Sequence, residues 1–204
     1  MGCNNSLVNN WVDEVASILR PDRIVWVNGS DQEYAEICNR LVAEGVFTRL
    51  NEESYPNSFW CVSDASDVAR VEDRTFICSI SQEDSGPTNH WQEPKEMYGT
   101  LDRLMAGCMK NRTMYVVPYL MGPDGSPYSK VGFELTDSPY VVANMRIMAR
   151  TGDVALKNLP DSSSDFVKGI HSIGSLDPEN RYICHFPQDN AIVSFNTNYG
   201  GNAL

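Results

Sequence analysis

The chain has 204 residues, which is enough for one large domain or two small ones around a buried core. With 42% hydrophobic and 21% charged residues it has the composition of a globular protein, and no stretch approaches the ~20 apolar residues of a membrane-spanning helix. The formal net charge of −11 repels polyanions, which argues against nucleic acid and anionic membranes as main partners. A small anionic substrate stays compatible with this charge, because one arginine can dominate a pocket.

The cysteines and the N-terminus bear on location. The six cysteines include no Cys-x-x-Cys pair and the three histidines are scattered, so we expect no zinc site but reduced, buried thiols in the cytoplasm. Because no cationic region precedes an apolar one, we expect no secretory signal. Met1-Gly2-Cys3-Asn4-Asn5-Ser6 fits the N-myristoylation pattern, with Cys3 as a second acylation position, but no polybasic stretch follows and we interpret the match as chance.

The first quarter of the chain predicts a helix, a strand and a second helix. Apolar residues recur with helical spacing over 9–19, and 24–27 is a short apolar run typical of a strand. Ser30 and Glu33 have the spacing of a capping box, which predicts a second helix that Gly45 stops.

The middle of the chain predicts short strands, one long loop and a helix. Residues 59–62 and 75–78 are apolar runs typical of strands, with a short helical turn at 66–71 between them. Residues 81–94 are polar and rich in turn formers, which predicts a loop of the length that often carries function. Apolar residues on one face then predict a helix over 96–109.

Two longer strands and a helix are predicted next. Residues 112–120 and 130–135 have apolar strand patterns. Asp137 is expected to cap a helix over 138–150, and Gly152 is expected to end it.

The last part predicts a short helix and a hairpin. A polar break at 161–164 is expected to lead into a short helix that reaches Gly169. Residues 181–186 and 191–195 are predicted to pair, because Pro187-Gln188-Asp189-Asn190 between them is a hairpin turn.

These elements predict an α/β fold, with a mixed β-sheet flanked by helices. We expect one domain over residues 9–204, with 1–8 disordered or an artificial extension.

Tyr199-Gly200-Gly201-Asn202 follows the last predicted strand. Two successive glycines allow a positive φ and let a ligand approach backbone amides that can form an anion-binding nest. The motif taken alone favours a simpler interpretation, a strand-ending turn, because Gly-Gly is common.

Arg70 is the second candidate for anion binding. Its guanidinium can pair with Asp64 or Asp67 to support a turn, or it can present a planar fork to a carboxylate. Spacing alone favours the ion pair. No Ser, Cys or His spacing supports a hydrolytic triad.

Several segments resemble the GTP-dependent phosphoenolpyruvate carboxykinases. The resemblance extends from about Asn9 to Leu204 and implies the N-terminal, substrate-recognition lobe of that fold, as a monomer. Its most specific segments, in chain order, are Asp67-Val68-Ala69-Arg70-Val71-Glu72, Arg112-Thr113-Met114-Tyr115-Val116-Val117-Pro118-Tyr119, Glu134-Leu135-Thr136-Asp137-Ser138-Pro139-Tyr140-Val141-Val142, Met145-Arg146-Ile147-Met148, His171-Ser172-Ile173-Gly174 and Tyr199-Gly200-Gly201-Asn202.

The resemblance implies an enzyme of gluconeogenesis that converts oxaloacetate and GTP to phosphoenolpyruvate, GDP and CO2 with Mn²⁺ or Mg²⁺. The family's substrate arginine matches Arg70, which reverses the preference for an ion pair and implies that its guanidinium holds a substrate carboxylate. The family's Tyr-Gly-Gly matches Tyr199, Gly200 and Gly201, which implies that the tyrosine ring edge faces that carboxylate and the glycine backbone contacts the substrate.

The resemblance also implies that the metal ligands, the phosphate-binding loop and the guanine pocket lie beyond Leu204. No segment matches Gly-x-x-x-x-Gly-Lys-Ser/Thr. We therefore expect no catalytic and no metal-binding residue in this chain, which we interpret as truncated, and no turnover by it alone. The alternatives are a non-catalytic dicarboxylate-binding module and a structural protein with a relic fold.

Overall fold

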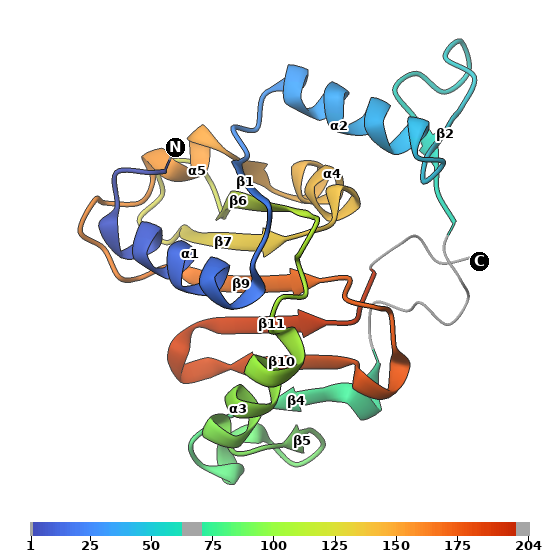
Figure 1. Cartoon of the computed structure of the whole chain (residues 1–204). Coiled ribbons are helices and arrows are strands. Elements are labelled where there is room, and N and C mark those ends of the chain that lie inside the picture. Colours follow the sequence, from blue (N-terminus) through green and yellow to red (C-terminus); the bar gives the residue numbers. More distant parts are fainter. Residues whose placement is uncertain (1, 63–70, 199–204) are drawn as a thin grey trace.

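The computed structural model describes residues 2–62 and 71–198 (Figure 1). Its centre is a nine-stranded mixed sheet, which confirms the predicted α/β class. The pairs β6–β7 and β10–β11 are antiparallel, whereas β1–β6, β7–β9, β9–β11, β10–β4 and β4–β5 are parallel. In sheet order the strands are β1 (Arg23–Trp26), β6 (Thr113–Met121), β7 (Lys130–Thr136), β9 (Val167–Ser172), β11 (Ala191–Phe195), β10 (Tyr182–Phe186), β4 (Thr75–Ile77) and β5 (His90–Trp91), and β8 (Arg150–Thr151) pairs with β6.

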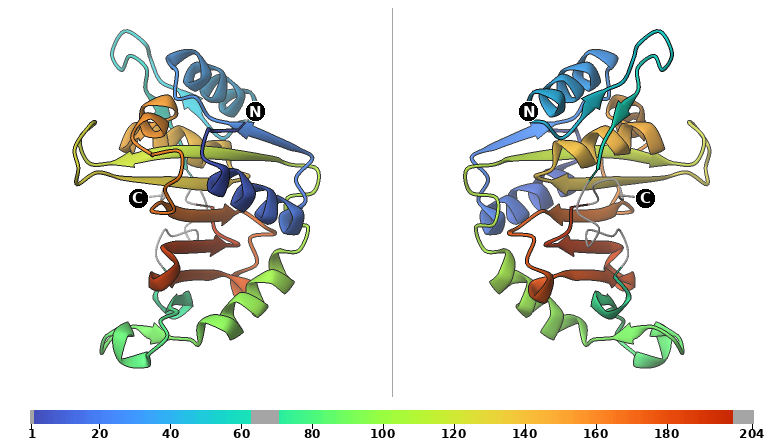
Figure 2. Two further views of the ribbon diagram at one scale, coloured as in Figure 1. Left: turned by 90° about the vertical axis from the view of Figure 1, so that its left-hand side faces the viewer. Right: turned by 90° about the vertical axis from the view of Figure 1, so that its right-hand side faces the viewer.

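Helices cover both faces of the sheet (Figure 2). The first and third helices lie on one face, and the second and fourth lie on the other. A separate two-stranded sheet joins β2 (Thr48–Arg49) to β3 (Phe59–Trp60). The helices are α1 (Ser6–Leu19), α2 (Asp31–Ala43), α3 (Pro94–Met105), α4 (Pro139–Met148) and α5 (Asp153–Lys157), and the 3₁₀ turns are η1 (Glu72–Arg74), η2 (Gln82–Ser85), η3 (Pro178–Asn180) and η4 (Pro187–Asp189).

The core has one apolar cluster on each face of the sheet. Alternate side chains of a strand point to opposite faces. Phe133 and Leu135 of β7 therefore join the cluster under α1 and α3, while Val117 of β6 joins the cluster under α2 and α4. This alternation is why the sequence pattern predicted β6 and β7 correctly.

The start of α2 departs from the expected capping box. The Ser30 hydroxyl accepts from the Glu33 N–H at 3.2 Å, as predicted. The Glu33 carboxylate, however, accepts from the N–H groups of Asn28 and Gly29, each at 2.9 Å. It therefore satisfies the loop before the helix rather than the backbone of Ser30.

Three predictions around α4 and β9 are wrong. Ser138 caps α4, because its hydroxyl accepts from the Val141 N–H at 3.3 Å, whereas Asp137 has other partners. Gly152 precedes α5 and does not end α4. The predicted short helix up to Gly169 is instead strand β9. Gly169 lies within this strand, and because it has no side chain it leaves space for the Glu134 carboxylate.

Other boundaries shift by a few residues. The expected boundary between residues 8 and 9 falls inside α1, which Asn5 caps from a buried position. The predicted loop at 81–94 contains η2 and β5, and α3 begins earlier than expected, at Pro94. The predicted turn at 66–71 lies almost wholly outside the described residues.

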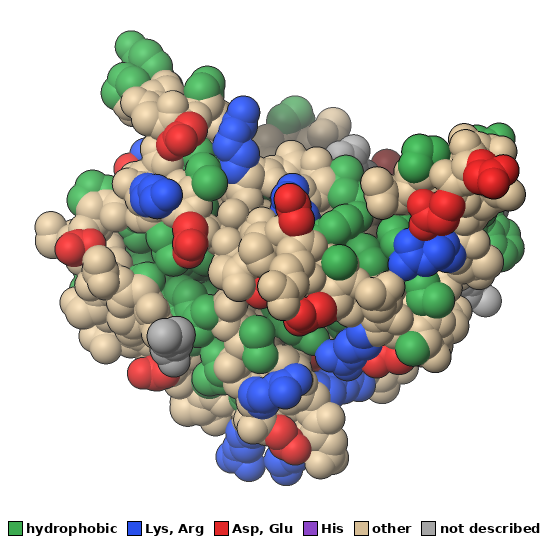
Figure 3. All heavy atoms as spheres, turned by 90° about the horizontal axis from the view of Figure 1, so that it is seen from above, with side chains coloured by type: hydrophobic (Ala, Val, Ile, Leu, Met, Phe, Trp, Pro, Cys, Tyr) green, Lys and Arg blue, Asp and Glu red, His purple; other side chains and the backbone are tan. Residues whose placement is uncertain are grey.

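Acidic and basic side chains are interspersed on the face seen from above, so the negative net charge forms no single acidic area there (Figure 3). Within the described ranges, no helix has the length and hydropathy needed to cross a bilayer.

Candidate functional site

The predicted site residues Arg70, Tyr199, Gly200 and Gly201 lie outside the described residues. The strands nearest to them in the sequence are described. Strand β4 begins shortly after Arg70, and β11 ends shortly before Tyr199.

Both strands pair with β10, which lies between them. Thr75 of β4 is opposite Ile183, and Phe195 of β11 is opposite Tyr182. The start of β4 and the end of β11 therefore lie at the same edge of the sheet. The arrowheads of β7, β9 and β11 also point to this edge (Figure 1).

Buried polar side chains gather at this edge. Ligands of α/β proteins commonly bind beyond the carboxyl ends of parallel strands. β7, β9 and β11 are such strands, because each is parallel to its neighbour in this group. We call the buried polar residues there the edge network, and none is more than 7% exposed: Thr136, Asp137, Ser138, His171, Ser172, Arg181, Asn196 and Thr197.

Asp137 is the charged centre of the edge network. Its side chain is completely shielded from solvent and pairs with Arg112 Nη1 at 2.6 Å. It also accepts from the Ser172 hydroxyl and from the Ile173 N–H, both at 2.9 Å. Arg112 donates further to the Gly174 carbonyl at 2.8 Å. The carboxylate thus ties the end of β7 to the start of β6 and to the loop after β9, which is why it is not available to cap α4.

His171 connects β7 to the residues after β11. Its Nδ1 lies 2.7 Å from the Thr136 hydroxyl, and its Nε2 lies 3.0 Å from the Thr197 carbonyl oxygen. Because a carbonyl only accepts, Nε2 must carry a proton. In a neutral ring Nδ1 then accepts from Thr136, whose oxygen accepts in turn from the Ser138 N–H at 3.0 Å.

The neutral state of His171 fits its surroundings. Burial lowers its pKa, since a charged ring would lose its hydration, although Asp137 and the Thr197 carbonyl act in the opposite direction. In a neutral imidazole, Nε2–H donates to the Thr197 carbonyl and Nδ1 accepts from the Thr136 hydroxyl.

Asn196 is held through all of its polar groups. Its carbonyl accepts from Arg181 Nε at 3.0 Å, and its amide group donates to the Asn180 carbonyl at 2.9 Å. The Ser175 N–H donates to its side-chain oxygen at 2.8 Å. Side chains therefore hold the backbone carbonyls of both Asn196 and Thr197. The buried Thr197 hydroxyl has no hydrogen-bond partner within the described chain.

A polar cavity of about 510 Å³ adjoins β4. Its lining includes Glu72, which follows Arg70 by two residues, and the side chains of His90 and His185. These histidines are far apart in the sequence, but strand pairing brings β5 and β10 to either side of β4. Burial lowers the pKa of His185, which favours a neutral ring at this wall.

No three His, Cys, Asp or Glu side chains of the described chain lie close enough together to hold a metal ion. The described residues therefore do not fit the divalent cation that the resemblance implies, and we assign no step to it.

Sequence reasoning missed the roles of Asp137, His171 and Arg181. The position of Asp137, a polar residue at the end of a predicted apolar strand, could have indicated its role. For His171 that signal was hidden, because β9 was predicted as a helix.

The whole chain is similar to known proteins. The family model described as the phosphoenolpyruvate carboxykinase N-terminal domain matches residues 10–204. A protein of Anaeromyxobacter sp. (strain K) named phosphoenolpyruvate carboxykinase (GTP) is 51% identical over 201 residues, covering 98% of this chain and 34% of that protein. Proteins of the same name from Corynebacterium jeikeium (strain K411) and Chlamydia pneumoniae are 45% and 46% identical, covering 98% and 97% of this chain and 35% of each relative. The chain thus spans about a third of the length of these curated relatives.

Proposed function

The chain belongs to the phosphoenolpyruvate carboxykinase N-terminal domain family, and we propose that it is the substrate-recognition part of a GTP-dependent phosphoenolpyruvate carboxykinase. The proposed reaction converts oxaloacetate and GTP to phosphoenolpyruvate, GDP and CO2. This chain would contribute the groups that hold and orient the oxaloacetate or phosphoenolpyruvate carboxylate. Such orientation lowers the entropic part of a reaction barrier.

The edge network is the observation that carries this proposal. It holds the backbone at Asn196 and Thr197, which Asn198 separates from Tyr199-Gly200-Gly201 in the sequence, at the edge where β4 begins. A backbone held in this way suits amide groups that must meet a carboxylate in one geometry. In the proposal Arg70 pairs with the carboxylate, the ring edge of Tyr199 faces it, and the amides of Gly200 and Gly201 donate to the substrate.

His171 and Arg181 act as positioning residues in this proposal. Neither needs to touch the substrate, because each donates to a backbone carbonyl just before the Tyr-Gly-Gly segment. Their contribution would appear as weaker substrate binding when the donor is lost.

The divalent cation and GTP would supply charge neutralisation and the phosphoryl group when bound. We propose that their sites and the catalytic residues lie outside these residues and that this chain alone has no turnover. All six cysteines are free, which supports the proposed reducing, cytoplasmic location.

The test is an NMR titration of this chain with phosphoenolpyruvate. We expect the amide signals of Gly200 and Gly201 to shift in the parent chain, and the shifts to be lost in Arg70→Ala. Arg103→Ala removes an exposed arginine from α3 and should leave the titration unchanged. If the folded parent shows no shift, or Arg70→Ala binds like the parent, the proposed site is wrong.

A further inference from the structure

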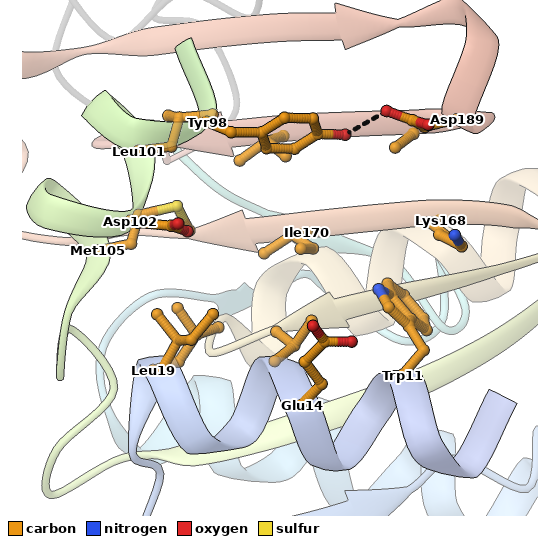
Figure 4. Close-up of a pocket in the computed structure, with 14 residues that line it drawn as sticks. Trp11, Glu14, Leu19, Tyr98, Leu101, Asp102, Met105, Lys168, Ile170 and Asp189 are labelled. Carbon is orange, nitrogen blue, oxygen red and sulfur yellow. Dashed lines mark hydrogen bonds between the residues drawn. The ribbon is translucent and has the colours of Figure 1, made fainter. Parts of the chain in front are cut away.

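A groove of about 320 Å³ lies between α1 and α3, over strands β9 and β11 (Figure 4). Ile170 and Val193 form its floor. Leu19 of α1 and Leu101 and Met105 of α3 form its walls. The volume is at the lower end of the ~300–1,000 Å³ range of small-molecule sites, which are mostly apolar with a few polar groups.

The polar groups around this groove are mainly acidic. Glu14 of α1, Asp102 of α3 and Asp189 of η4 line it, against one base, Lys168. No ion pair joins the Glu14 or Asp102 carboxylate to another described residue, so both are available to a ligand.

The other two charged groups of the groove, Asp189 and Lys168, already have partners and lie at one end of it (Figure 4). The Tyr98 hydroxyl donates to Asp189 at 2.9 Å. Burial raises the pKa of Tyr98 above its usual value, and the Asp189 carboxylate raises it further. The Lys168 ammonium lies over the Phe166 ring, 5.8 Å from its centroid. Figure 4 shows Lys168 and Asp189 at one end of the groove, with Glu14 and Asp102 nearer the other.

We propose that this groove binds a small organic cation, an ammonium or guanidinium group carried on an apolar aromatic or alkyl body. The body would lie on Ile170 and the other apolar residues of the floor, and the cation would lie between Glu14 and Asp102. An anion of the same shape would meet three carboxylates and one ammonium, and is expected to bind more weakly. The Trp11 ring also lines the groove, toward the end where Lys168 lies (Figure 4).

The groove is separate from the edge network. The Lys168 and Asp189 end of the groove lies at the start of β9 and in the turn before β11, away from the ends of these strands where the edge network lies. Ile170 and His171, as neighbours in one strand, point to opposite faces. Binding in the groove is thus an activity beyond the proposed substrate recognition.

The test uses 2-phenylethylammonium as the probe, with methyl NMR signals of Ile170 and Met105 as the readout. We expect saturable shifts at millimolar concentration that weaken as salt is added. Phenylacetate, of similar shape but opposite charge, should bind more weakly.

The variant Glu14→Gln with Asp102→Asn should weaken binding of the probe roughly fivefold to tenfold, because two exposed ion pairs are lost. The control pair Asp13→Asn with Glu36→Gln makes the same change in charge outside the groove and should leave the dissociation constant unchanged. All four positions are exposed, so folding is expected to be retained in both variants. Absence of methyl shifts, equal binding of phenylacetate, or equal affinity of the two double variants would overturn the proposal.

Discussion

Asp137→Asn tests how much the edge network contributes to stability. The substitution keeps the shape of the side chain and removes its charge. In the parent chain the completely shielded carboxylate accepts from Arg112, Ser172 and Ile173. An amide can still accept from Ile173, but its NH₂ group would face two donors.

The expected loss in unfolding free energy follows from these contacts. Breaking a fully buried ion pair costs ~3–5 kcal/mol, and a hydrogen bond to a charged group contributes ~1.5–3 kcal/mol. Because the Arg112 side chain is 37% exposed and can be hydrated, we expect a smaller loss of about 2–3 kcal/mol. For a chain of this size that corresponds to a melting temperature lower by about 4–12 °C.

Urea denaturation followed by circular dichroism measures this difference. Asp165→Asn is the matched control, because it makes the same substitution in the exposed pair with Lys130 and should change stability by less than about 0.5 kcal/mol. If Asp137→Asn were as stable as Asp165→Asn, the edge network would not be a stabilising unit and its role in holding the backbone would have to be abandoned.

Three further predictions concern single positions. His171→Gln retains a donor for the Thr197 carbonyl and should bind phosphoenolpyruvate better than His171→Leu in the NMR titration; equal affinities would contradict the positioning role. Burial raises the pKa of Glu134 to about 8, so its neutral form is favoured in the folded state. The unfolding free energy should therefore fall as pH rises between the ordinary glutamate range and about 8, and Glu134→Gln should flatten that dependence in denaturation measured at several pH values. Gly152 and Gly125 both have a positive φ, but only at Gly152 would a methyl group overlap the backbone of the loop between β1 and α2, so Gly152→Ala should lower the melting temperature more than Gly125→Ala.

The sequence pattern predicted those elements whose own residues report their burial. The helical spacing over 9–19 marks the side of α1 that packs on the sheet, and the turn at Pro187–Asp189 joins the β10–β11 hairpin as predicted. In each case the information is local in the sequence, either the helical spacing of apolar residues or a turn motif.

Strand β9 could not be predicted in this way. Its residues Val167–Ser172 include a lysine, a glycine and a histidine and show no strand period. It is a strand because β7 and β11 hydrogen-bond it from both sides, which is a property of the assembled sheet.

The edge network was hidden for the same reason. Asp137 has the sequence position of a helix cap, but its partners Arg112 and Ser172 are distant in the chain. The roles of Arg70 and Tyr199-Gly200-Gly201 came only from the family resemblance, and they stay predictions.

The place of the β10–β11 hairpin in the sheet has a consequence for how the chain folds as it is made. Among the described residues, β4 and β5 join the main sheet only through β10, which is synthesised roughly 100 residues later. A nascent chain can pair β4 with β5, but the β4 edge that later meets β10 must stay open while the intervening residues emerge, and open strand edges are prone to wrong association. We expect this part of the sheet to form last on the ribosome, and to be the part on which chaperones act.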